Sequence, residues 1–246
     1  MGNNPKITVV TVCYNAVDVI EKTILSIINQ TYSNIEYIVI DGNSSDGTVD
    51  IIKKYSDRIS KWISEPDTGI YDAMNKGIDL AIGEWINFMN AGDHFVSNTV
   101  IEEMMAEEDS DCEVLFGNTI LVRGDYQVVR KGQYLENDFP NLSHQSVFVK
   151  TEMLKDRHFD LKFKICADFA FLYGLYKEGR KFCHKDIDVA QFDMAGLSAT
   201  HRAQLYQEHC AIRDIKPRWN KLLKYRIEDA LPQRFMNWVS IISMRK

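Results

Sequence analysis

The fold of this 246-residue chain is decided by residues 7–42, ITVVTVCYNAVDVIEKTILSIINQTYSNIEYIVIDG. ITVVTVCY and IEYIVI are continuous runs of strand-forming residues, the pattern of strands buried on both faces of a sheet. Between them, apolar residues recur every three or four positions, at Val17, Ile20, Ile24 and Ile28, which predicts an amphipathic helix. The stretch therefore predicts a strand-helix-strand unit with parallel strands.

The same alternation continues to residue 89. Helices are expected at 48–55 and 70–82, and strands at 59–64 and 84–89. Parallel sheets of this kind bind ligands beyond the carboxyl ends of their strands. Four polar segments follow the predicted strands and should converge on one rim: Tyr14-Asn15, Asp41-Gly42, Glu65–Asp67 and Asn90–Asp93.

The second half mixes element types. We expect a hairpin around residues 123–125, strands at 144–150 and 186–192, a helix at 167–177 and helical structure from about residue 200. We interpret residues 1–212 as one α/β domain, with a nucleotide-binding half at 1–95 and an acceptor-binding half at 96–212. Residues 213–246 are interpreted as a basic helical tail.

Charge is distributed unevenly along the chain. The net charge is −6, but residues 1–112 carry 7 basic and 19 acidic side chains, and residues 213–246 carry 9 basic and 3 acidic ones. An acidic first half argues against nucleic acid as a partner. Acidic residues suit a divalent cation, whereas the basic tail suits an anionic surface.

Cysteines and apolar runs indicate the compartment. The five cysteines are an odd number, widely spaced, and contain no CxxC pair, so we predict neither a disulfide framework nor a zinc site. A reducing compartment is expected. No apolar run reaches the roughly 18 residues of a membrane span, and MGNNPK does not have the apolar core of a signal peptide. The sequence thus predicts a cytoplasmic protein.

Motifs exclude several enzyme classes. The sequence contains no GxGxxG after the first strand, no GxxxxGK[ST], no GxSxG and no HExxH. After these exclusions, the carboxylates of the rim remain as candidate functional groups. Asp41 could accept hydrogen bonds from a nucleobase or ribose, or could cap the helix near Thr48. Asp93 could hold Mg²⁺ or Mn²⁺ across a diphosphate, or could form an Asx-turn.

Two longer stretches carry a family resemblance. TVCYNAVDVIEKTILSIINQTYSNIEYIVIDGNSSDGTVDII resembles the opening of glycosyltransferase family 2, and EPDTGIYDAMNKGIDLAIGEWINFMNAGD is similar to its bacterial surface-polysaccharide branch. The resemblance is close over about residues 6–95 and looser through SHQSVFVK and CADFAFLYGLYKEG to near residue 198. It implies a GT-A fold with a mostly parallel central sheet and flanking helices, a nucleotide-sugar donor and inversion at the anomeric carbon.

The resemblance also implies residue roles. Asp93 would bind the divalent cation, Mn²⁺ or Mg²⁺, although Asn90 replaces the first carboxylate of the family's metal motif. Asp168, in CADFAFL, would be the catalytic base, the alternative being an Asp favoured at a helix N-terminus. His144 would contact the acceptor or serve the structure. The donor would contact residues Thr11, Tyr14, Asp41, Asp72, Asn75, Lys76, Asn90, Ala91, Gly92 and Asp93.

The expected activity is transfer of one sugar from a nucleotide-diphosphate-sugar, such as a UDP-sugar, to a glycan or lipid-linked acceptor. No QxxRW motif is present, which argues against a processive synthase. A nucleotidyltransferase would need a Gly-rich, basic loop after the first strand, where CYNAVD stands. A non-catalytic sugar- or lipid-binding module is the other alternative, and the presence of Asp168 disfavours it.

The tail suggests a membrane surface. Leu231, Phe235, Trp238 and Ile242 recur at spacings of four, three and four, so a helix would place them on one face. A basic amphipathic helix with aromatic residues is typical of segments that lie in a membrane interface. The tail could therefore bind the cytoplasmic face of the inner membrane as a peripheral anchor, or it could pack on the catalytic domain.

Overall fold

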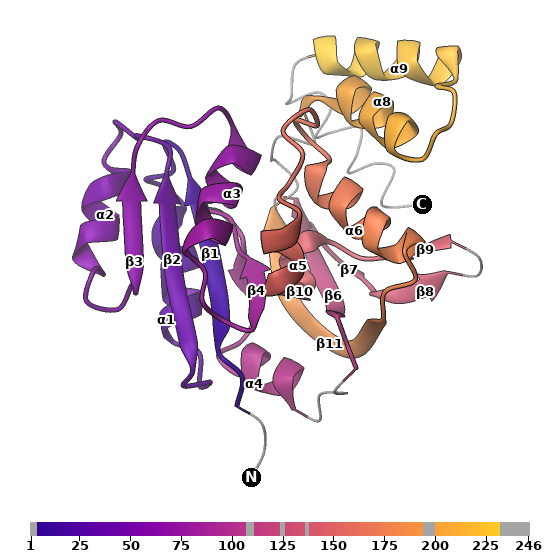
Figure 1. The fold of residues 1–246 in the computed structure, drawn as a ribbon. Helices are drawn as coiled ribbons and strands as arrows, with labels where there is room; N and C mark the ends of the chain where they lie inside the picture. The colour runs from indigo at the N-terminus through magenta and orange to yellow at the C-terminus, as the bar shows by residue number, and fades with distance from the viewer. Residues whose placement is uncertain (1–3, 107–110, 124–125, 136–137, 194–199, 232–246) are drawn as a thin grey trace.

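The computed structural model describes residues 4–106, 111–123, 126–135, 138–193 and 200–231. In these residues a nine-stranded sheet runs in the order β3-β2-β1-β4-β10-β6-β11-β5, with β7 paired to β6. Helices cover both faces of the sheet (Figure 1). The predicted α/β class is confirmed.

The first half follows the predicted alternation closely. All its strand pairs are parallel. Its first helix begins at Ile20 rather than Val17, and the backbone N–H groups of Ala16 and Val17 donate to the side chains of Thr48 and Asp46. The elements are β1 Ile7–Cys13, α1 Ile20–Ile28, β2 Ile35–Asp41, α2 Thr48–Lys54, β3 Lys61–Ser64, α3 Ile70–Leu80 and β4 Trp85–Phe88.

Alternate residues of β1 enter two separate cores. Ile7 and Val9 pack on the side of α1 and α2, whereas Val10 and Val12 pack on the side of α3. All four side chains are buried, which explains why the strand is apolar throughout. Helix α3 lies so close to β1 that a Cβ on Gly77 would stand 2.5 Å from Val10. The glycine therefore sets the distance between α3 and the sheet.

The second half is a mixed sheet. Strand β10 runs antiparallel between β4 and β6, and β6 pairs with β7 as the predicted hairpin. The strand expected at 144–150 begins at Val147, because residues 144–146 form a 3₁₀ turn. The elements are β5 His94–Phe95, α4 Val100–Met105, β6 Val114–Arg123, β7 Tyr126–Arg130, β8 Gln133–Leu135, β9 Asp138–Asn141, η1 His144–Ser146, β10 Val147–Lys150, α5 Thr151–Asp156, α6 Ala167–Lys177 and β11 Phe182–Asp193.

The cysteine prediction was wrong in one respect. Cys112 and Cys183 form a disulfide between the start of β6 and β11, where a framework of paired cysteines was not expected. The two residues are 71 positions apart, and they meet because β6 and β11 are parallel neighbours. Strand register of this kind cannot be read from cysteine spacing.

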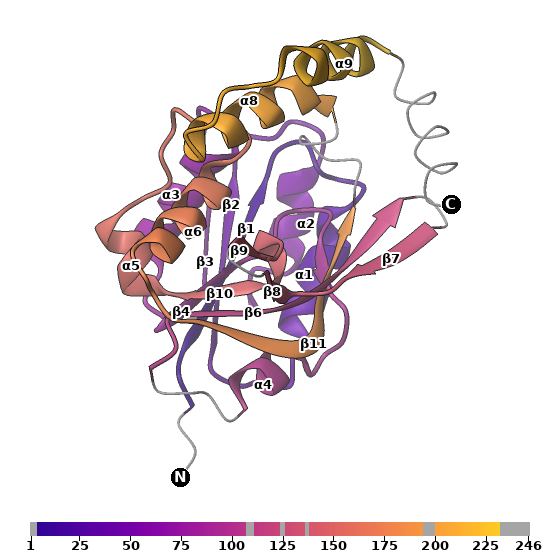
Figure 2. The same ribbon diagram turned by 90° about the vertical axis from the view of Figure 1, so that its right-hand side faces the viewer.

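Two helices, α8 Arg202–Ile212 and α9 Trp219–Ala230, follow the sheet and pack against each other. Helix α8 lies between α9 and α6, as Figures 1 and 2 show. The predicted tail residues Phe235, Trp238 and Ile242 lie outside the described residues. None of the helices that the structure describes is both long and apolar enough to cross a bilayer. The division into two half-domains and a tail stays a prediction.

Candidate active site

The rim predicted from the sequence forms at the end of β1. The backbone N–H of Gly42 donates to Cys13 O, and that of Ala91 donates to Val12 O, so the turns after β2 and β4 both attach to this strand. Asp41 is fully buried there. Its carboxylate accepts hydrogen bonds from the Ser44 backbone N–H and from two serine hydroxyls, which fixes the turn that follows β2.

Tyr14 and Thr11 differ sharply in accessibility. The side chain of Tyr14 is 66% exposed at the rim, whereas Thr11 is buried in the sheet. The Thr11 hydroxyl donates to Met89 O at 2.8 Å and accepts from the Tyr37 hydroxyl at 3.1 Å. Thr11 thus holds β1 to the segment after β4, and a donor at this rim would meet Tyr14 first.

The three residues of α3 that were predicted to contact the sugar donor are bonded to neighbouring segments of the chain. Asp72 accepts from the Thr68 backbone N–H at 2.8 Å. Asn75 both donates to and accepts from the backbone of Phe159. Lys76 pairs with Glu65 at 2.8 Å. These contacts fix the loops beside α3, and a direct role in donor binding stays a prediction.

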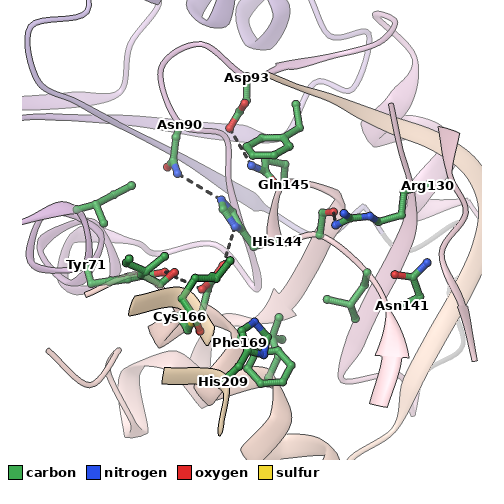
Figure 3. A pocket seen from close by; sticks show the side chains of 18 of the residues that line it. Tyr71, Asn90, Asp93, Arg130, Asn141, His144, Gln145, Cys166, Phe169 and His209 are labelled. Carbon is green, nitrogen blue, oxygen red and sulfur yellow. Dashed lines mark hydrogen bonds and ion pairs between the residues drawn. The ribbon is translucent and has the colours of Figure 1, made fainter. Parts of the chain in front are cut away.

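A cavity of about 710 Å³ connects the turn after β4 with helices α6 and α8. Figure 3 shows its side chains, several of which point toward one another. The residues that line it include Tyr71, Asn90, Asp93, Arg130, His144 and Asp168. The structure therefore brings six predicted positions into one cavity: Asn90, Ala91, Gly92, Asp93, His144 and Asp168.

A hydrogen-bonded network centres on Asp168. One of its carboxylate oxygens lies 2.7 Å from Nδ1 of His144, and the other lies 2.7 Å from the hydroxyl of Tyr71. Nε2 of His144 in turn lies 3.3 Å from Nδ2 of Asn90. The network joins α3, the turn after β4, η1 and α6, as the dashed lines in Figure 3 show in part.

Helix α8 secures the loop that carries Asp168. The Glu208 carboxylate accepts hydrogen bonds from the backbone N–H groups of Lys164, Ile165 and Cys166, directly before α6. An acidic side chain at a helix N-terminus satisfies N–H groups that have no partner within the helix. Glu208 therefore fixes the start of α6 and with it the position of Asp168.

Electrostatics couple His144 to Asp168. Burial opposes charge on both groups, but each stabilises the other. The Asp168 carboxylate, with a further contribution from Asp93, raises the pKa of His144 above its ordinary value. The His144 imidazolium and the Tyr71 hydroxyl lower the pKa of Asp168. The two titrations are coupled, so the pair gains and loses protons as a unit.

Asp93 lies on another wall of the cavity and is 6% exposed. Its carboxylate accepts a hydrogen bond from Gln145 Nε2 at 3.0 Å. Oδ1 of Asn90 is buried and has no hydrogen-bond partner among the described residues. Two oxygens from the same turn suit Mg²⁺ or Mn²⁺ as a partial ligand set. No group of three or more His, Cys, Asp or Glu side chains within the described ranges could hold a metal, so a bound ligand would have to supply oxygens.

Sequence reasoning missed several residues that line the cavity or hold the loop beside it. Tyr71 stands beside the expected Asp72 but did not appear as a partner of Asp168, and Glu208 carried no motif. Arg130, at the end of β7, also lines the cavity. Only Tyr71 was close to a recognised motif. The other two come from segments whose periodicity indicates nothing about their partners.

Comparison with known families gives one match, and curated relatives extend it. The family model described as Glycosyl transferase family 2 matches residues 8–179. A GalNAc(5)-diNAcBac-PP-undecaprenol beta-1,3-glucosyltransferase of Campylobacter jejuni is 30% identical over 219 residues, covering 81% of this chain and 70% of that protein. An uncharacterized glycosyltransferase of Mycobacterium tuberculosis is 38% identical over 104 residues, which is 42% of this chain and only 40% of the length of that relative.

Solved structures show the same fold. TarS of S. aureus, residues 1–349 in complex with UDP, has a TM-score of 0.68 at 20% identity, covering 84% of this chain and 64% of that one. The mannosyltransferase PcManGT of Pyrobaculum calidifontis, in complex with GDP-Man and Mn²⁺, has a TM-score of 0.64 at 16% identity, covering 92% and 69%. At these identities the likeness concerns the fold, and it agrees with the expected GT-A architecture.

Proposed function

The chain belongs to glycosyl transferase family 2, and on that premise we propose that it transfers one sugar from a UDP-sugar to a hydroxyl of a glycan or lipid-linked acceptor in surface polysaccharide biosynthesis. One observation carries the proposal: a single cavity holds Asp93 on one wall and the His144–Asp168 pair on another. The UDP complex of TarS and the undecaprenol-linked substrate in the name of the C. jejuni relative support the choice of donor and acceptor.

The proposed chemistry is a direct displacement with inversion. An acceptor hydroxyl oxygen attacks C1 of the donor sugar, the bond from C1 to the diphosphate oxygen breaks, and the nucleoside diphosphate leaves with the electron pair. Asp168 takes the hydroxyl proton as the new bond forms. His144 and Tyr71 hold its carboxylate in place, each at 2.7 Å. No redox change and no covalent enzyme intermediate are needed.

The donor would bind along the rim and reach Asp93. Tyr14 and Asp41 would frame the nucleobase and ribose, and residues 90–93 would face the diphosphate. A divalent cation held by Asp93 and Asn90 Oδ1 would supply positive charge to the diphosphate oxygens. Gln145 keeps the Asp93 carboxylate in position. The exposed Tyr14 ring and the buried orphan oxygen of Asn90 support this placement.

The function is tested by the release of free UDP. We expect the protein with Mn²⁺ and a UDP-sugar to release UDP much faster when a lipid-linked acceptor is added, with a glycosylated product of matching amount. A nucleotidyltransferase would instead release pyrophosphate from a nucleoside triphosphate and a sugar phosphate. A binding module would bind the UDP-sugar without turnover. Screening donors by thermal shift first selects the sugar, because a ligand of the folded state stabilises it.

We further propose that α9 rests on an anionic leaflet at the cytoplasmic face of the membrane. Trp219, Leu223 and Ile227 follow each other at spacings of four along α9, and all three are exposed, at 75%, 41% and 55%. Basic residues flank them at Lys216, Arg218, Lys221, Lys224 and Arg226. Each basic residue close to an anionic surface contributes about 1 kcal/mol to binding.

Replacement of Trp219, Leu223 and Ile227 by serine is expected to weaken binding to phosphatidylglycerol-containing liposomes at least about tenfold, because it removes apolar area from the interface. Co-sedimentation at low salt measures this. Ile82→Ser, at another exposed apolar position, is the matched control. Unchanged liposome binding by the triple variant, or a wild-type protein that stays in the supernatant, would show that α9 contacts protein instead.

A further inference from the structure

Arg130 is a cation that lines the cavity and has no acidic partner among the residues that the structure describes. Its guanidinium donates through Nη1 to the hydroxyl of Ser143 at 3.0 Å, and no carboxylate in the described part of the chain pairs with it. Figure 3 shows the side chain pointing toward His144 from the side opposite Tyr71. Most of its five N–H donors thus lack a charged acceptor.

Two other arginines of the chain have carboxylate partners. Arg157 pairs with Glu178 at 2.7 Å, and Arg180 pairs with Glu113 at 2.9 Å. Both side chains are exposed to water, yet each has a carboxylate partner. Arg130 is partly buried, and burial lowers the pKa of its guanidinium. Withdrawing a cation from water without a counter-ion is unfavourable, so such a site suits an incoming anion.

The anchor of Arg130 places it on the acceptor side. Ser143 directly precedes His144, whose ring bonds to Asp168. In an inverting displacement the base and the acceptor lie on the face of C1 opposite the leaving diphosphate. The diphosphate belongs near Asp93, on the wall that Gln145 holds. Through Ser143 the guanidinium is therefore anchored next in the chain to the histidine that bonds the base.

The charges that line the cavity point the same way. Lys164 and Arg213 join Arg130 there, and the carboxylates are Asp93 and Asp168. Asp168 is already balanced by His144, and Asp93 is the candidate cation ligand. Among the described residues the guanidinium of Arg130 pairs with neither carboxylate, so the cavity wall does not supply its counter-charge. An acceptor with its own negative charge would supply it.

We propose that Arg130 binds an anionic group of the acceptor, a phosphate or a carboxylate, within about one sugar of the hydroxyl that is glycosylated. The guanidinium fork matches both anions with two parallel N–H···O bonds. This inference rests on the proposed transferase function. It names the chemical class of the acceptor, which the family membership leaves open.

The test uses inorganic phosphate and glucuronate as probes for the two anions, each titrated against the full chain by thermal shift in EDTA. We expect the wild type to bind at least one of them, and Arg130→Gln to bind it at least about tenfold more weakly, because a charge-assisted pair is lost. Binding of UDP with Mn²⁺ should stay within about twofold. Arg58→Gln, at an exposed position after α2, carries the same charge change and should match the wild type.

Three results would overturn the inference: no binding of either probe by the wild type, equal binding by Arg130→Gln, or a parallel loss of UDP–Mn²⁺ affinity, which would assign Arg130 to the donor. Arg130→Lys covers the case in which the glutamine variant does not fold. It keeps the charge but not the fork, so it should bind the probe more weakly than the wild type. If the wild type binds phosphate but not UDP, the proposed transferase function is wrong. The assignment of Arg130 to the acceptor rests on that function and would then be wrong as well.

Discussion

Asp168→Asn is expected to lower the rate of sugar transfer at least about 100-fold while leaving the affinity for UDP with Mn²⁺ nearly unchanged. The amide keeps the shape of the carboxylate and can still accept from His144 Nδ1 and bond to the Tyr71 hydroxyl. It cannot take the proton of the acceptor hydroxyl. The measurements are the transfer rate at saturating donor and acceptor and a UDP titration on the same preparation.

The control is Asp160→Asn, which removes a carboxylate that pairs with Lys162 at the surface. This variant should transfer at the wild-type rate. A thermal melt of each variant shows whether the fold is retained. Retention of more than about a tenth of the wild-type activity by Asp168→Asn would remove Asp168 from the role of base.

The pH profile separates Asp168 from His144 as the proton acceptor. The pKa of His144 is raised and that of Asp168 is lowered, so the ion pair persists between the two folded-state pKa values. While His144 is charged, it weakens Asp168 as a base. Transfer should therefore increase as the pH rises through the raised pKa of His144, and this step should vanish in His144→Asn. If His144 itself were the base, His144→Asn would be inactive at every pH.

The second large effect is expected at Asp93. Asp93→Ala should lower transfer at least about 100-fold and abolish any response to Mn²⁺ or Mg²⁺, because a metal ion contributes several kcal/mol to stabilising charge on a leaving diphosphate. Isothermal titration of UDP with and without Mn²⁺ measures the loss. The variant should bind UDP equally weakly in both conditions.

Asp67→Ala serves as the comparison for this experiment. Asp67 is also a rim carboxylate, but it accepts a hydrogen bond from the Gly69 backbone N–H in its own loop. Its replacement should leave the Mn²⁺ response in place. Full activity of the wild type in excess EDTA would contradict the metal hypothesis directly, whatever the behaviour of the variants.

The sequence alone was sufficient for the first half of the fold. Strands β1 and β2 and helix α1 follow from local periodicity. A continuous apolar run indicates a strand buried on both faces, and apolar residues at every third or fourth position indicate a helix. The rim followed from the rule that parallel strands end at one edge. The positions of Asp93 and Asp168 in one cavity were consistent with the family resemblance, although their roles stay predictions.

The contacts within the cavity were decided only by the tertiary structure. Tyr71 and Asp168 lie 97 residues apart and bond because α3 and α6 face the same side of the sheet. Arg130 and the disulfide of Cys112 likewise depend on how β7 and β11 align with β6. Periodicity determines which face of an element is buried. It contains no information on strand register or on the partner across a cavity, because those depend on atoms that are distant in the chain and meet only when the whole sheet is assembled.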